Sequence, residues 1–112
     1  MNGKFISLEG VEGSGKTLQA HLLYSYLKKS NYKTVQTAEP GSTYMGRTIR
    51  KILLNPKNSS LTHTTELFLY LADRSQHTAE VIIPKLKKNY IVICDRFIDA
   101  TLAYQGAGRM IS

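Results

Sequence analysis

An eight-residue segment near the N-terminus constrains this chain more than any other feature. It lies between a short apolar run, residues 5–8, and a helical pattern that begins at residue 16. The segment reads Gly10-Val11-Glu12-Gly13-Ser14-Gly15-Lys16-Thr17. This is the pattern G-x-x-x-x-G-K-T, in which a loop between a strand and a helix wraps its backbone amides around phosphate oxygens. The order of strand, loop and helix therefore predicts an α/β domain that binds a nucleoside triphosphate.

Each residue type in residues 10–17 has a chemical task. Glycine lets the backbone approach a phosphate without a Cβ clash, and the helix that follows adds the positive end of its dipole. We expect Lys16 to reach the β- and γ-phosphates of ATP and the Thr17 hydroxyl to hold Mg²⁺. The alternative is a glycine-rich turn with a solvated Lys16, which would leave the agreement of strand, loop and helix unexplained.

A second apolar run, residues 90–95, ends in an acid. Its composition is typical of a fully buried parallel strand. Ligands of parallel sheets collect at the carboxyl ends of the strands, so we expect Asp95 near Thr17, where it can hold Mg²⁺ directly or through water. Arg96 follows at once, and its guanidinium can hold a second phosphate with two hydrogen bonds. A helix-capping Asp95 and a structural Asp95–Arg96 ion pair are the alternatives.

Strand and helix patterns alternate along the rest of the chain. Strands are expected over residues 3–8 and 33–37, a loop over 39–43, and helices over 16–30, 44–54, 64–86 and 97–106. The first helix should carry one apolar face, made of Leu18, Leu22, Leu23, Tyr26 and Leu27. The third should be capped by Thr62 or Thr64 and either continue or break before Pro84. This alternation indicates a parallel α/β sheet.

Composition narrows the class of protein. A length of 112 residues suits one small domain, and the apolar runs are shorter than a membrane span or a signal peptide needs. The single cysteine, Cys94, cannot form a disulfide within one chain, which favours the cytoplasm. The net charge of +7 fits a nucleic-acid partner or a basic site for nucleotides with a solvated basic surface, and we favour the second. No nucleic-acid or membrane partner is therefore expected.

Several further motifs, in order, make the chain resemble thymidylate kinase. They are the segment 10–17 with its acidic Glu12, Glu39-Pro40-Gly41-Ser42-Thr43 with Ile49-Arg50, residues 67–74 with Gln76-His77, Asp95-Arg96-Phe97, and Ala103-Tyr104-Gln105-Gly106. The resemblance implies transfer of the γ-phosphoryl group of ATP to dTMP, giving dTDP, with Mg²⁺ as cofactor. It also implies a P-loop nucleoside monophosphate kinase-like sheet with helices on both faces, present in part, and a homodimer. Residues 1–112 would form one domain that ends before the family's mobile lid.

The resemblance implies which residues bind the thymine base of dTMP. Tyr70 would stack on the ring, and Arg74 would donate to the O4 edge, where cytosine carries an amino group. Gln105 would read the edge near N3 with help from Thr101, and Tyr104 would crowd the 2′ position and favour deoxyribose. Plain packing or surface positions are the alternative for each of these residues.

The resemblance also implies the residues at the sugar and phosphates. Glu12 would lie near the 3′-hydroxyl, Arg50 would reach the dTMP side, and Arg96 would hold the dTMP phosphate. Lys16 and Arg96, with the metal at Asp95, would stabilise charge in a loose transition state. The loop at 10–17 carries no arginine, and family members without one supply it from the lid.

Some alternatives stay open at this point. Another deoxynucleotide or deoxynucleoside kinase would share most of these motifs, and a nucleotide-binding module without catalysis would share the phosphate loop. His21 and His77 are predicted to be packing or surface groups of helices. The sequence also departs from the family at Ser42, Phe97 and Ala100, where glycine, tyrosine and serine are usual.

Overall fold

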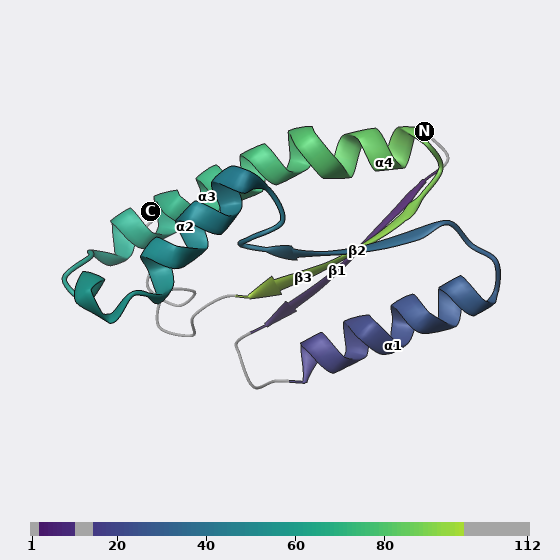
Figure 1. The fold of residues 1–112 in the computed structure, drawn as a ribbon, viewed down its shortest axis with the longest axis horizontal. Helices are drawn as coiled ribbons and strands as arrows, with labels where there is room; N and C mark the ends of the chain where they lie inside the picture. Colours follow the sequence, from purple (N-terminus) through teal and green to yellow (C-terminus); the bar gives the residue numbers. More distant parts are fainter. Residues whose placement is uncertain (1–2, 11–14, 98–112) are drawn as a thin grey trace, which may run out of the picture.

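The computed structural model describes residues 3–10 and 15–97, without the side chains of Lys16 and Phe97. Its described part contains three parallel strands in the order β1-β3-β2. The strands are β1 (Lys4–Gly10), β2 (Thr34–Glu39) and β3 (Ile91–Phe97). In Figure 1 all three arrows point the same way, so their carboxyl ends meet at one edge of the sheet. The last strand of the described chain is thus the central one.

Helices lie on both sides of this sheet. Helix α1 (Lys16–Lys29) covers one side, and α3 (His63–His77) and α4 (Ile83–Lys87) lie on the other (Figure 1). Helix α2 (Tyr44–Leu54) packs on α3, and the short turn η1 (Pro56–Asn58) connects them. The fold expected from the sequence, a parallel sheet with helices on both faces, is confirmed.

The third helix continues through Pro84, where the sequence had left open whether it would break. A π-helical turn, η2 (Thr78–Ile82), joins α3 to α4 without a break. Pro84 is the second residue of α4, two positions after this turn, and proline has no amide hydrogen for the carbonyl four residues earlier. A π-helical turn widens the helix where that hydrogen bond is missing. The start of α3 is capped by Thr62, whose Oγ1 accepts a hydrogen bond from the Thr65 amide at 3.1 Å.

The core centres on β3. Val92, Ile93 and Cys94 are completely buried, because strands and helices surround the central strand. From α1, Ala20 is fully buried against this layer, with Leu23 and Leu27 half-buried. The expectation of one apolar face on α1 was wrong in part, since Leu18, Leu22 and Tyr26 are exposed. These three form a separate stripe at a spacing of four residues, turned away from the sheet.

The boundaries of the elements differ from the expected ones by one or two residues. Each strand begins one residue later than expected and runs two residues further, and α1 ends one residue earlier. The helix expected over residues 97–106 lies outside the described residues beyond Phe97. Within the described ranges, no helix is long and apolar enough to cross a membrane.

Candidate functional site

Charged side chains end all three strands at their shared carboxyl edge. Glu9 is the penultimate residue of β1, Glu39 ends β2, and Asp95 and Arg96 stand near the end of β3. The register pairs Arg96 with Glu9 on one side and with Glu39 on the other. Because the sheet is parallel, these groups converge where such sheets bind their ligands.

Thr17 and Asp95 are in direct contact at this edge. The Thr17 hydroxyl, in the first turn of α1, donates a hydrogen bond to Asp95 Oδ2 at 2.9 Å. The Asp95 side chain is buried, whereas Thr17 is exposed. A hydroxyl and a carboxylate are hard oxygen donors of the kind that Mg²⁺ prefers. The contact joins the end of the phosphate-loop motif to the strand that was expected to lie beside it.

Glu39 is a buried carboxylate at the centre of a charge network that reaches the surface at Arg74 and Glu9. Its Oε1 atom accepts hydrogen bonds from Arg74 Nε at 2.9 Å and from Arg96 Nε at 3.0 Å. Both guanidinium groups also lie 3.8 Å from Glu9 Oε1. Arg96 is further held over the ring of Phe5, with its Cζ 5.1 Å from the ring centre. Two arginines predicted to bind dTMP are therefore brought together by one carboxylate.

The other oxygen of Glu39 faces a histidine. His77, on α3, is completely buried, and its Nδ1 lies 2.7 Å from Glu39 Oε2. Burial alone would raise the pKa of Glu39, but the hydrogen bonds from His77 and Arg74 and the charges of Arg96 and Arg74 outweigh it and lower the pKa to about 2. Glu39 is therefore ionised at neutral pH, and the His77 Nδ1 must carry the hydrogen that it donates.

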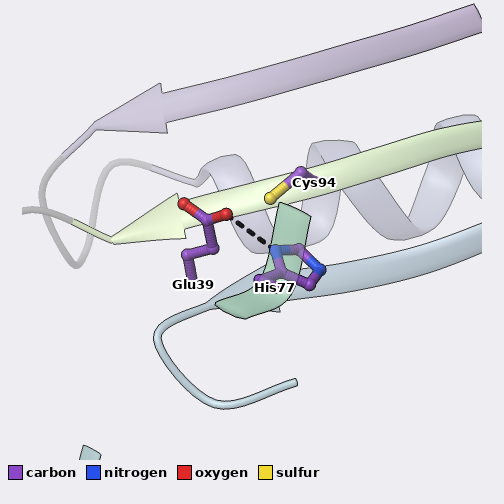
Figure 2. Close-up of side chains that lie close together, drawn as sticks. All are labelled: Glu39, His77 and Cys94. Carbon is purple, nitrogen blue, oxygen red and sulfur yellow. Dashed lines mark hydrogen bonds and ion pairs between the residues drawn. The ribbon is translucent and has the colours of Figure 1, made fainter. Parts of the chain in front are cut away.

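Cys94 lies beside this network, as Figure 2 shows together with Glu39 and His77. Burial raises the pKa of its thiol to about 11, and the charge of Glu39 acts in the same direction. Cys94 is therefore a protonated, buried thiol near neutral pH, in line with the small apolar role expected of it.

The loop between β2 and α2 is fixed by buried polar contacts. The Gly41 amide donates to Asp73 Oδ1 at 3.1 Å, and Asp73 is completely buried on α3. Burial raises the pKa of Asp73, and the Gly41 hydrogen bond opposes this shift. Arg50 donates from Nη1 to the Pro40 carbonyl at 3.1 Å, so this predicted dTMP residue braces the same loop. The loop follows Glu39 directly in the chain, so these contacts fix the segment next to the carboxylate.

The sequence profile described as "Thymidylate kinase" matches residues 8–112. The chain belongs to the thymidylate kinase family. The matched segment includes the carboxyl ends of all three strands. It also includes α1, which carries Thr17, and α3, which carries Arg74 and His77.

Individual members of the thymidylate kinase family agree with the profile. Thymidylate kinase of Pelobacter propionicus is 56% identical over 110 residues, which are 98% of this chain and 50% of that protein. Thymidylate kinase of Desulforapulum autotrophicum is 56% identical over 108 residues, 96% of this chain and 48% of that protein. The chain thus spans about half the length of these curated relatives.

The fold also matches a solved member of the family. The crystal structure of thymidylate kinase from Ehrlichia chaffeensis superposes with a TM-score of 0.82 and 43% sequence identity. The match covers all of this chain and 63% of that one. The expected P-loop kinase-like fold, present in part, is therefore confirmed.

The remaining predicted site residues fall into two groups. Gly10 ends β1, Gly15 precedes α1 with a left-handed φ of 85°, and Lys16 is the first residue of α1. Tyr70 is half-buried on α3, one turn before Arg74 and on the same side of that helix. The other predicted residues lie outside the described ranges: Val11, Glu12, Gly13, Ser14, Thr101, Tyr104 and Gln105.

Three residues of the site were not predicted as functional from the sequence. Glu39 and Asp73 were named only as members of family motifs, with no role of their own. His77 was expected to be a packing or surface group. His77 does pack in the core, yet it also contacts the network. One signal could have identified Glu39, because it ends its strand at the same edge as Asp95. The sequence holds no comparable local signal for His77, whose partner is 38 positions away.

Proposed function

We propose that this chain, with any sequence encoded beyond residue 112, transfers the γ-phosphoryl group of ATP to dTMP and yields dTDP. We call that protein the complete encoded chain. One observation carries the proposal: the Thr17–Asp95 hydrogen bond of 2.9 Å lies at the same strand edge as the arginine pair on Glu39. A triphosphate site and a second cationic site would therefore share one edge, as transfer between two nucleotides requires.

Residues of the phosphate loop would bind the donor. The backbone amides of residues 10–15 and the Lys16 ammonium would hold the ATP phosphates. Thr17 and Asp95 would hold Mg²⁺, which supplies positive charge to the phosphate oxygens. Their oxygen donors fit that ion, and the Thr17 hydroxyl already contacts Asp95 Oδ2.

The arginine pair would bind the acceptor. Arg74 and Arg96 each use Nε for Glu39, and Arg74 Nη2 and Arg96 Nη1 also lie 3.8 Å from Glu9 Oε1, too far for a hydrogen bond. A guanidinium has five N–H donors, so donors on Nη1 and Nη2 could turn to a ligand. Arg96 would take the dTMP phosphate, and Arg74 would read the thymine O4 edge beside Tyr70. Arg50, with Glu12, Thr101, Tyr104 and Gln105, would complete the acceptor site. Since the attacking phosphate is already anionic, alignment and charge stabilisation would suffice for catalysis.

Three finer statements belong to the same proposal. The active protein would use Mg²⁺ as its cofactor, work in the cytoplasm and form a homodimer. Sedimentation of the complete encoded chain measures the oligomeric state, and a monomer at micromolar concentration would contradict the dimer.

The test is ADP formation by the complete encoded chain with ATP, Mg²⁺ and dTMP. Lys16→Ala should abolish turnover, whereas the matched control Lys29→Ala, at the exposed end of α1, should leave it unchanged. dUMP, dCMP and thymidine are compared as acceptors. Equal rates with dCMP would contradict the Arg74 assignment, and ATP binding without ADP formation would show a nucleotide-binding module instead of a kinase.

A further inference from the structure

The buried carboxylate of Glu39 contacts three side chains at once, and it can do so in one orientation only. Oε1 serves both arginines, at 2.9 and 3.0 Å, and Oε2 serves His77 at 2.7 Å. The Glu39 side chain is 4% exposed, so water cannot replace a partner that is lost. The orientation of the carboxylate plane therefore decides whether both guanidinium groups stay in place.

His77 contacts the carboxylate oxygen that the arginines do not use, and so it can fix that orientation. Its imidazole is fully buried on α3, and Nε2 has no hydrogen-bond partner among the described residues, so Nδ1 makes the ring's one polar contact there. A carboxylate can rotate about its last torsion with little cost, and a donor fixed on one oxygen removes that freedom. With Oε2 held by His77, Oε1 is turned toward the open edge of the sheet, where Arg74 and Arg96 meet.

The same three side chains could also be read as a metal site. The ligand atoms of Glu39, His77 and Cys94 all lie within 4.8 Å of one another (Figure 2). Two guanidinium groups on Oε1 would repel a cation, and metal-binding histidines almost always donate their second ring nitrogen to a partner, which Nε2 lacks here. The thiol of Cys94 is also protonated. The contacts thus favour a carboxylate that orients two arginines over a metal centre.

We propose that His77 is a positioning residue for the acceptor nucleotide. By holding Oε2 of Glu39, it keeps Oε1 available to Arg74 and Arg96 and so holds the two guanidinium groups in place for the acceptor nucleotide, Arg96 for its phosphate and Arg74 for its base edge. This role rests on the proposed function, because dTMP is the ligand that the pair would receive. His77 itself does not touch the reacting atoms.

Two substitutions separate positioning from packing. His77→Leu fills much of the volume of the imidazole but has no donor, so Oε2 loses its partner. His77→Asn is smaller, yet its amide nitrogen lies close to where Nδ1 lies and can still donate. A role in packing alone predicts that the leucine variant is the milder one, whereas positioning predicts that the asparagine variant is.

The first measurement needs neither ligand nor activity. In ¹⁵N-edited NMR spectra of the complete encoded chain, the Nε–H groups of Arg74 and Arg96 should exchange slowly because Glu39 accepts from both. Arg74→Lys and Arg96→Lys assign the two signals. The signals should persist in His77→Asn and broaden or vanish in His77→Leu. Unchanged signals in His77→Leu would overturn the positioning role whatever the enzyme does.

The second measurement is steady-state kinetics with ATP and dTMP. His77→Leu should raise the KM for dTMP about tenfold to a hundredfold and leave the KM for ATP within about threefold, while His77→Asn stays near wild type. Equal changes in both KM values would overturn the proposal. If wild type makes no ADP from dTMP, the proposed function fails, and the NMR result still decides the role of His77. Stoichiometric Zn²⁺ binding that displaces the arginine signals would support the metal site instead.

Discussion

Replacing Glu39 with glutamine tests the charge network through the stability of the fold. The environment lowers the pKa of Glu39 from 4.5 to about 2, a difference of about 2.5 units. At about 1.4 kcal/mol for each unit, the ionised carboxylate adds about 3 kcal/mol to the free energy of unfolding. Because the pKa in the folded state is the lower one, this stability is fully present above pH 4.5 and is lost as pH falls to about 2.

Urea unfolding of wild type and Glu39→Gln across pH 7 to pH 2.5 measures this directly. At neutral pH the variant should be less stable by about 3 kcal/mol, and the gap should close by about 1.4 kcal/mol for each pH unit below 4.5. The raised pKa of Asp73 acts in the opposite direction, with its cost relieved as pH falls. That residue is present in both proteins, but the charge of Glu39 contributes to its raised pKa, so its effect cancels only in part in the difference.

A matched control is available on η2. Glu80 is exposed and accepts a hydrogen bond from Gln76 Nε2 at 2.7 Å, so Glu80→Gln keeps the shape and removes only a surface charge. It should change the free energy of unfolding by less than about 0.5 kcal/mol. A gap between wild type and Glu39→Gln that stays constant from pH 7 to pH 3 would refute the reasoning, because it would mean that Glu39 has no lowered pKa.

Two further predictions concern the loop and the metal. Gly46→Ala should destabilise the fold by about 1–3 kcal/mol, because the new Cβ would overlap Asp73 Oδ1, whereas an open helical position would gain about 1 kcal/mol from alanine. A higher melting temperature would therefore contradict the packing described around Gly46. Asp95→Asn should lower kcat with ATP and dTMP on the order of 100-fold at saturating Mg²⁺, since it removes the carboxylate that faces Thr17. Chelation of Mg²⁺ from wild type should cause a comparable loss, and turnover by the variant at the wild-type rate would exclude Asp95 as the ligand.

The fold was predictable because its signals are local. The apolar run before Asp95 and the loop at residues 10–17 identify two parallel strands, and the alternation of patterns identifies the rest. The ends of the strands were placed short because pairing across the sheet decides them. β3 continues through Arg96, for instance, since that residue pairs with Glu9 and Glu39 on its two neighbours.

The site was predictable only where a rule links sequence to position. Thr17 and Asp95 were expected to meet because both stand at the carboxyl edge of a parallel sheet, and they do. The meeting of Arg74 and Arg96 on one carboxylate depends on how α3 rotates over β2, which no local pattern encodes. The same holds for His77, which periodicity alone cannot distinguish from other helix residues.

The strand order has a consequence for how the chain reaches its structure. β1 and β2 are not neighbours, and among the described strands each pairs only with β3, so neither has a partner in this three-stranded sheet until residues 91–97 exist. Thr17 and Asp95 are 78 positions apart, and closing such distances in sequence slows folding. During synthesis on a ribosome, the first two strands would therefore stay unpaired in this sheet while α2 and α3 are made. The residues that assemble the sheet are then the same ones that complete the charged carboxyl edge, with Asp95 and Arg96.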